Sequence, residues 1–201
     1  MMRFGPGVAL VVVDMQNDFA DPRGSLTVAG APAIVPIVNA QVAQARAARS
    51  LVVFTQDWHP KHTPHFARDG GAWPVHCVAD TWGSEFCPGL DCPPGSPLIR
   101  KGTNGEDGYS AFTMRDPDSG ATVPTPLETL LHEAGVDTVV VVGLATDYCV
   151  KATALDAIRL GHHTTVITDA VAAVEVKPGD GERALAELEA AGVVLASSLT
   201  R

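Results

Sequence analysis

The chain has 201 residues, of which 46% are hydrophobic and 18% charged, a composition typical of a globular protein with a sizeable core. A formal net charge of −9, with no basic cluster, argues against nucleic acid or an anionic membrane as a partner. The first apolar run, residues 8–13, is too short for a membrane span and lacks the cleavage region of a signal peptide, which favours a cytoplasmic protein.

The first predicted strand covers this same continuous apolar run and ends at Asp14. A carboxylate at the carboxyl end of a buried strand lies where an open α/β sheet builds its binding site. A helix cap or turn residue is an equally strong interpretation of a single Asp, so Asp14 alone does not decide between the two roles. Residues 34–50 follow as a predicted helix, with Ile34, Ile37 and Val38 on one face.

A second strand, residues 51–55, leads into a polar loop that contains the majority of the seven histidines. In an extended chain Asp57 and His59 point the same way, because side chains alternate with a period of two. Mixed nitrogen and oxygen ligands suit zinc, iron or manganese. A solvated loop is the alternative, but the number of histidines beside Asp57 favours a metal site. The candidate ligands are Asp57, His59, His76 and either His65 or His62.

A third short strand, residues 97–101, ends at Lys101 after an irregular stretch from Asp80 to Pro97 that is rich in proline and glycine. An isolated lysine is usually a solvated surface side chain. Beside a carboxylate and a thiol, however, a lysine stabilises both anions. A turn over residues 104–108 and a helix over 127–134 are expected next.

The run of valines at 139–142 predicts a buried strand that stops at Gly143, and helical spacing begins at about Thr146 and continues to about Leu160. Cys149 therefore lies where a strand passes into a helix. Backbone N–H groups and the helix dipole are expected there to lower the thiol pKa and to hold an oxyanion. The alternative is a small buried hydrophobic residue, which is the usual role of a lone cysteine.

The four cysteines are expected to be free thiols, with Cys87 and Cys92 solvated in a loop and without a role. The remaining elements are a strand over 164–168, a turn beginning at Asp169-Ala170-Val171, a helix over 181–191 and a strand over 193–196. No glycine-rich nucleotide-binding motif follows a strand, which argues against a nucleotide site.

This order of elements predicts an α/β fold with three layers, α/β/α, around a doubly wound, mostly parallel sheet of about six strands. We expect residues 1–201 to form a single domain with an irregular excursion around residues 60–97. Four chemically active side chains stand at ends of predicted strands, which places them at one rim of the sheet. They are Asp14, Asp57, Lys101 and Cys149.

Five segments carry a resemblance to a known family: Asp14–Phe19, Asp57–His59, Trp73–Cys77, Lys101–Gly102 and Gly143–Val150. They resemble the isochorismatase-like cysteine hydrolases, and most closely their nicotinamidase (pyrazinamidase) branch. The turn around Cys149 marks the whole superfamily, whereas the Asp-x-His and Trp-Pro-x-His motifs mark the branch with a metal site. The resemblance covers nearly the whole chain.

The resemblance implies a metal-dependent cysteine amidohydrolase that cleaves nicotinamide, and also pyrazinamide, to the acid and ammonia through a thioester. It implies a catalytic triad of Asp14, Lys101 and Cys149. One divalent metal is implied, with zinc favoured over iron or manganese, on Asp57, His59 and His76, with His65 as a ligand found only in some members.

The resemblance also places Phe19, Trp73, Tyr109 and Tyr148 around the substrate ring. It implies a cis peptide between Leu144 and Ala145, with the N–H groups of Ala145 and Cys149 as the oxyanion hole.

The small molecule nicotinamide is thus the expected partner, with neither nucleic acid nor membrane involved. Two alternatives stay open: another amide or carbamoyl hydrolase of the superfamily, and a non-catalytic metal- or ligand-binding domain on the same fold. A vinyl-ether hydrolase acting on isochorismate is a weaker alternative, because that reaction does not need the Asp-x-His site. The sequence leaves open the metal, a homo-oligomeric state and the role of the loop from Asp80 to Pro97.

Overall fold

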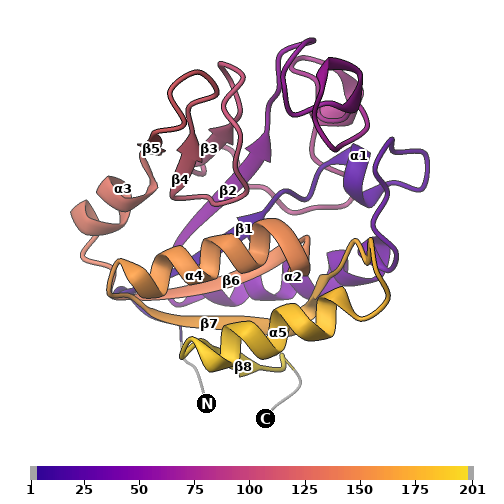
Figure 1. Cartoon of the computed structure of the whole chain (residues 1–201). Coiled ribbons are helices and arrows are strands. Elements are labelled where there is room, and N and C mark those ends of the chain that lie inside the picture. Colours follow the sequence, from indigo (N-terminus) through magenta and orange to yellow (C-terminus); the bar gives the residue numbers. More distant parts are fainter. Residues whose placement is uncertain (1–3, 199–201) are drawn as a thin grey trace.

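A computed structural model describes residues 4–198 and contains one six-stranded sheet of order β3-β2-β1-β6-β7-β8 (Figure 1). Every pairing within this sheet is parallel, so the predicted fold class is confirmed. The strands are β1 (Val8–Val13), β2 (Leu51–Asp57), β3 (Leu98–Lys101), β6 (Thr138–Leu144), β7 (His163–Ala172) and β8 (Val194–Ala196).

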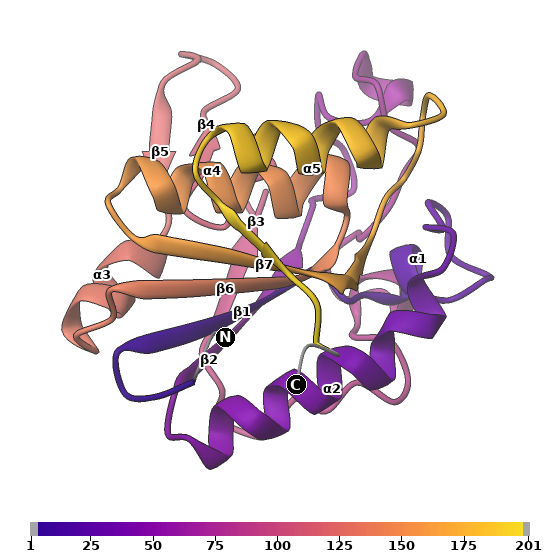
Figure 2. The same ribbon diagram turned by 90° about the horizontal axis from the view of Figure 1, so that it is seen from below.

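Helices cover both faces of the sheet, and Figure 2 shows α2 on one side with α4 and α5 on the other. Alternate residues of β1 explain the two layers, because Leu10 and Val12 join the core beneath α2 whereas Val11 joins the core beneath α3, α4 and α5. The helices are α1 (Asn17–Ala20), α2 (Ala31–Ala47), α3 (Leu127–Glu133), α4 (Lys151–Arg159) and α5 (Asp180–Ala190).

The sheet changes its winding direction between β1 and β6, since β2 and β3 extend from β1 on one side and β6, β7 and β8 follow on the other. Ligands bind at such a switch point, beyond the carboxyl ends of the strands. Gly143 lets the two strand ends come close, because a Cβ at this residue would lie 2.2 Å from the carbonyl oxygen of Val13. Asp14, the residue that follows β1, therefore lies directly beside the turn that carries Cys149.

The structure corrects several predicted boundaries. The prediction of a turn at residues 169–171 is wrong, because β7 continues to Ala172 after a register shift and still pairs with Gly143 and Leu144. The helix expected from Thr146 begins as a π-helical turn, Thr146–Val150, before α4. The antiparallel hairpin of β4 (Thr113–Arg115) and β5 (Thr122–Pro124) was not predicted. Short 3₁₀ turns also form at Ala67–Asp69 and Trp82–Ser84.

The loop from Asp80 to Pro97 packs against its own α2. Asn39 on α2 donates to the carbonyl oxygen of Gly89 (2.7 Å) and accepts from the N–H of Asp91 (2.8 Å). The prediction that Cys87 is a solvated thiol is therefore wrong, because this packing buries it in the core, while Cys92 is half-buried. All four cysteines are free, as predicted. Within residues 4–198, no helix has the length and apolar character needed to cross a membrane.

Candidate active site

The predicted triad meets at the carboxyl edge of the sheet, where Asp14 follows β1, Lys101 ends β3 and Cys149 lies in the turn after β6. The Nζ atom of Lys101 donates to Oδ2 of Asp14 over 2.7 Å and lies 3.4 Å from Sγ of Cys149. All three side chains are buried. Side chains more than 130 residues apart in sequence thus form one hydrogen-bonded group.

Lys101 also contacts the expected metal site, because its Nζ lies 2.8 Å from Oδ1 of Asp57. Burial alone lowers the pKa of Lys101, but the carboxylates of Asp14 and Asp57 outweigh burial and hold that pKa well above its usual range. The raised pKa favours the charged ammonium, which offsets the repulsion between two buried carboxylates.

The expectation of a lowered thiol pKa at Cys149 is wrong for this structure. Burial raises the pKa of Cys149 well above its usual range, the nearby ammonium of Lys101 opposes the rise, and the carboxylates of Asp14 and Asp57 add to it. Because the sulfur is enclosed beside two acids, the backbone N–H groups do not decide its protonation. The thiol needs a base to take its proton.

Asp14 is placed to be that base. Burial raises its pKa above the usual aspartate value, and the charge of Lys101 limits the rise. Thr55 fixes the carboxylate, because its hydroxyl donates to Oδ1 of Asp14 over 2.5 Å and accepts from the N–H of Asp14 over 3.1 Å. The reactive atoms of Asp14 and Cys149 lie within 4.8 Å of each other.

Three of the four predicted metal ligands are histidines that form a buried cluster. One nitrogen from each of His59, His65 and His76 lies within 4.8 Å of the others. Oδ2 of Asp57 is 3.8 Å from Nε2 of both His59 and His76. Burial lowers the pKa of His59 and so favours the neutral ring that a metal requires.

His59 supplies the test of whether these residues suit a metal. Both of its ring nitrogens are buried and have no hydrogen-bond partner among the described residues. Buried polar atoms are nearly always paired, so an orphaned imidazole facing two other imidazoles and a carboxylate fits a divalent cation. Of the two candidates His65 and His62, the structure places only His65 in this cluster, whereas the His62 side chain is 79% exposed and pairs with Asp69.

A pocket of about 370 Å³, a volume that includes space open to solvent, has Cys149 in its lining. Trp73 donates from Nε1 to the hydroxyl oxygen of Tyr109 (3.0 Å), and its ring meets that of Tyr148 edge-on. All four predicted ring-packing residues line the pocket, which are Phe19, Trp73, Tyr109 and Tyr148. Four further lining residues were not predicted, namely Leu26, Val28, Leu144 and Val174.

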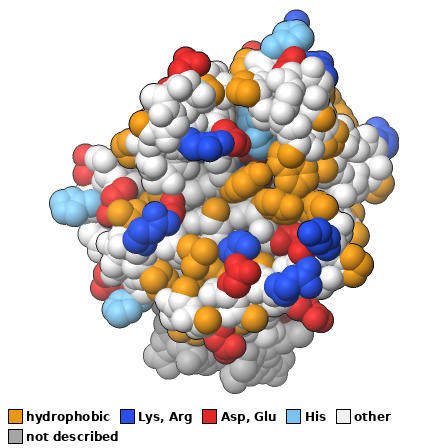
Figure 3. All heavy atoms as spheres, viewed as in Figure 1, with side chains coloured by type: hydrophobic (Ala, Val, Ile, Leu, Met, Phe, Trp, Pro, Cys, Tyr) orange, Lys and Arg blue, Asp and Glu red, His pale blue; other side chains and the backbone are white. Residues whose placement is uncertain are grey.

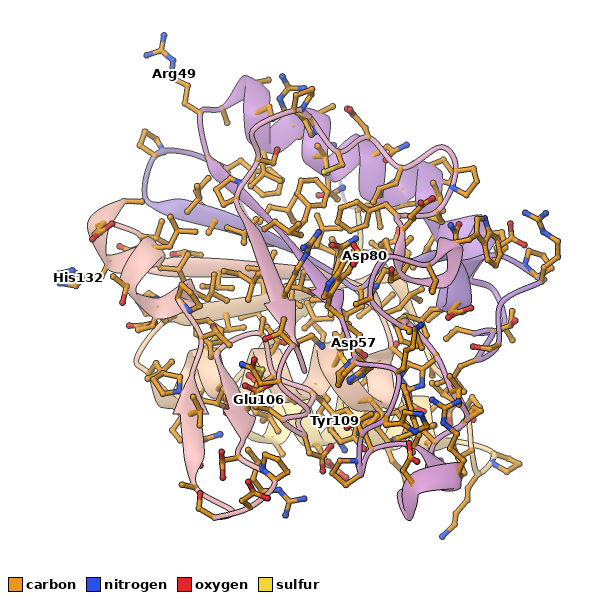
Figure 4. The ribbon with its side chains drawn as sticks, turned by 90° about the horizontal axis from the view of Figure 1, so that it is seen from above. Arg49, Asp57, Asp80, Glu106, Tyr109 and His132 are labelled. Carbon is orange, nitrogen blue, oxygen red and sulfur yellow. The ribbon has the colours of Figure 1, made fainter. Side chains whose placement is uncertain are left out.

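Figure 3 shows hydrophobic side chains gathered on this face beside a recessed histidine. Seen from above, Asp57 and Tyr109 lie toward the middle of the molecule, whereas His132 projects outward at its periphery (Figure 4). Ala145 also lines the pocket, and the Leu144–Ala145 peptide is cis as expected.

Sequence reasoning missed the residues that hold the site in place. Gln16 pairs with the backbone of Asp57, accepting from its N–H over 2.8 Å and donating to its carbonyl oxygen over 2.7 Å. Oδ1 of Asp107 lies 2.8 Å from Nδ1 of His65. Gln16 lies inside the family motif Asp14–Phe19, and its place in that motif could have marked it as a residue of the site. Nothing in the local sequence marks Asp107 as a partner of a histidine 42 positions away.

A buried thiol, acid and ammonium at the carboxyl edge of a doubly wound sheet define an α/β cysteine hydrolase, here with a site for a divalent metal beside the thiol. The chain belongs to the isochorismatase family, because residues 8–198 match the isochorismatase domain.

Proteins similar to this chain include a nicotinamidase of Acinetobacter baylyi, which is 39% identical over 98% of this chain and 95% of its own length. Among solved structures, the pyrazinamidase of Pyrococcus horikoshii in complex with zinc is 39% identical, with a TM-score of 0.85 over 96% of this chain and 99% of that one. PnC1 from L. infantum in complex with nicotinate is also 39% identical, with a TM-score of 0.87 over 98% of this chain and 96% of that one.

Proposed function

We propose that this protein hydrolyses nicotinamide to nicotinate and ammonia, and acts on pyrazinamide in the same way. The observation that carries the proposal is the contact of Lys101 with both Asp14 and Cys149, at the base of an aromatic pocket that Asp57, His65 and His76 also line. Similarity to a nicotinamidase, and to structures that hold zinc or nicotinate, supports the substrate.

The chain's own residues account for the steps of amide cleavage. The Asp14 carboxylate takes the proton of the Cys149 thiol, and the sulfur attacks the carboxamide carbon to form a C–S bond. Asp14 then passes that proton to the leaving nitrogen, so that ammonia departs and a thioester remains. Water adds to the thioester carbon with Asp14 again as the base, nicotinate leaves and the thiol is restored. Lys101 stabilises the charges on Asp14 and on the sulfur throughout.

The backbone N–H groups of Ala145 and Cys149 are proposed as the oxyanion hole. Both residues line the pocket beside the sulfur. Donors fixed in position before the reaction stabilise the negative charge that develops on the carboxamide oxygen, and the loss of one such donor typically costs ~100–1000-fold in rate.

Asp57, His59, His65 and His76 are proposed to hold one divalent metal, with zinc favoured. When bound, the metal supplies a Lewis-acidic position for the ring nitrogen of the substrate. Phe19, Trp73, Tyr109 and Tyr148 enclose the ring, so its carboxamide is directed toward Cys149. A cytoplasmic location belongs to the same proposal and is supported by the four free thiols.

An ammonia-release assay with nicotinamide, before and after chelation, tests the proposal. We expect turnover by the protein as purified, loss of nearly all of it after the metal is stripped, and recovery when zinc is added back. The ligand residues are buried, so the chelator must act long enough for metal content to fall, which elemental analysis verifies. Ammonia release that persists in metal-free protein would favour another amide hydrolase that uses the same triad.

The pH dependence follows from the environment of Asp14. Its pKa is raised from 3.8, so the folded protein holds this proton more tightly than an exposed aspartate and protonates the base at a higher pH. We expect kcat/KM of the metal-saturated enzyme to fall as pH drops through this raised pKa, which places the acid limb above 3.8. A profile that stays flat down to about pH 4 would show that Asp14 is not the base.

A further inference from the structure

The three clustered histidines differ in what their second ring nitrogen contacts. Nδ1 of His76 lies 2.7 Å from the carbonyl oxygen of Pro74, and His59 has no partner on either nitrogen. Nδ1 of His65 lies 2.8 Å from a carboxylate oxygen, Oδ1 of Asp107. His65 is thus the one member of the cluster whose ring is held by a charged acceptor.

The carboxylate of Asp107 is itself held in one orientation. Its Oδ1 accepts from the N–H of Gly108 (2.9 Å), and its Oδ2 accepts from a guanidinium nitrogen of Arg115 (2.8 Å). The backbones of Asp107 and Arg115 also exchange two hydrogen bonds, so β4 anchors this part of the loop. Both carboxylate oxygens thus face N–H donors, so Asp107 is placed to accept a hydrogen bond from Nδ1 of His65.

The same short segment reaches the triad. Two residues after Asp107, the carbonyl oxygen of Tyr109 lies 3.3 Å from Nζ of Lys101, and the Tyr109 ring lines the pocket. One stretch of three residues therefore contacts a histidine of the metal site, the catalytic lysine and the substrate pocket. A change in the Asp107 side chain is expected to act first through His65, because the other two contacts are made by Tyr109.

We propose that Asp107 is a positioning residue for the metal site. It fixes His65 as the tautomer protonated on Nδ1, so Nε2 is the nitrogen that faces His59 and His76, and it makes this nitrogen a stronger electron donor. This inference rests on the proposed metal site and deepens it, because it makes His65 a ligand that depends on a carboxylate outside the cluster.

The test compares the zinc dissociation constants of the full-length wild type, Asp107→Asn, His65→Ala and the double variant, each measured by competition with a chromophoric chelator. Asp107→Asn keeps the shape of the side chain and removes its charge. We expect it to weaken zinc binding by ~10–100-fold, the usual cost of losing the outer partner of a ligating histidine. Because Asp107 acts through His65, the double variant should bind zinc no more weakly than His65→Ala alone.

Asp116→Asn is the matched control, since Asp116 directly follows β4, the strand with which Asp107 pairs, and accepts hydrogen bonds from Ser119 without contacting the histidines. We expect it to bind zinc as the wild type does. A second readout needs no zinc: the ¹⁵N shifts of the His65 ring in metal-free protein should report the Nδ1–H tautomer in the wild type and a mixture of tautomers in Asp107→Asn.

Zinc affinity of Asp107→Asn within about twofold of wild type, or losses that simply add in the double variant, would overturn the role of Asp107 while leaving the metal site intact. A ring of His65 that carries its proton on Nε2 in the metal-free wild type would overturn it as well. A wild-type chain that binds no zinc would overturn both this inference and the proposed metal site.

Discussion

Replacing Cys149 with alanine is expected to lower kcat/KM for nicotinamide by roughly 10⁶-fold, the size of the loss when the nucleophile is removed from residues that act as a unit. Asp14 and Lys101 cannot compensate, because neither forms the covalent intermediate. The sulfur does not belong to the histidine cluster, so the variant should bind as much metal as the wild type. Steady-state assays with elemental analysis of the same samples measure both quantities.

Cys92→Ser is the matched control, because this half-buried thiol packs beside α2 and does not line the pocket. It should retain wild-type kcat/KM. If Cys149→Ala kept even a tenth of wild-type activity, the sulfur would not be the nucleophile, and direct attack by water would have to replace the thioester route.

Replacing Lys101 with methionine is expected to lower the free energy of unfolding by ~3–5 kcal/mol, because removing one partner of a buried ion pair leaves an uncompensated charge. Lys101 is 1% exposed, and its ammonium contacts the carboxylates of both Asp14 and Asp57 within 2.8 Å. Without it, two buried acids face each other. Urea unfolding of metal-free protein at pH 7 measures the loss, and amide hydrolysis should be abolished in the same variant.

A second substitution separates charge from packing. Adding Asp14→Asn to Lys101→Met removes one of the stranded carboxylates and should recover part of the lost stability. Lys151→Met is the surface control, since the pair of Lys151 with Glu187 is solvent-exposed and should contribute about 0–1 kcal/mol. An unfolding free energy for Lys101→Met within about 1 kcal/mol of wild type would show that the lysine does not neutralise these acids.

The position of the catalytic residues at one edge of the sheet could be predicted, because parallel sheets obey a simple rule. Asp14 and Lys101 each stand at the carboxyl end of an apolar run, and parallel strands place such ends at one edge. The choice between His65 and His62 could not be made in the same way. Both follow the same strand in a proline-rich loop, and only packing buries one ring and leaves the other 79% exposed.

The thiol pKa shows why local sequence is an incomplete guide to chemistry. The turn around Cys149 predicted a lowered pKa from helix-terminal N–H groups, whereas burial beside Asp14 and Asp57 raises it. Those carboxylates come from other strands, so their effect is a property of the assembled sheet. Asp107 was missed for a related reason, because its link to His65 depends on the hairpin of β4 and β5, whose two strands are only three residues long.

The account depends most on a covalent bond between the substrate's acyl group and Cys149. Rapid acid quenching during turnover of nicotinamide, followed by mass spectrometry of the peptide that contains Cys149, tests this most directly. We predict a nicotinoyl group on Cys149 that appears before nicotinate is released and is absent from Cys77, Cys87 and Cys92. Full-rate turnover with Cys149 unmodified at every quench time would contradict the thioester mechanism.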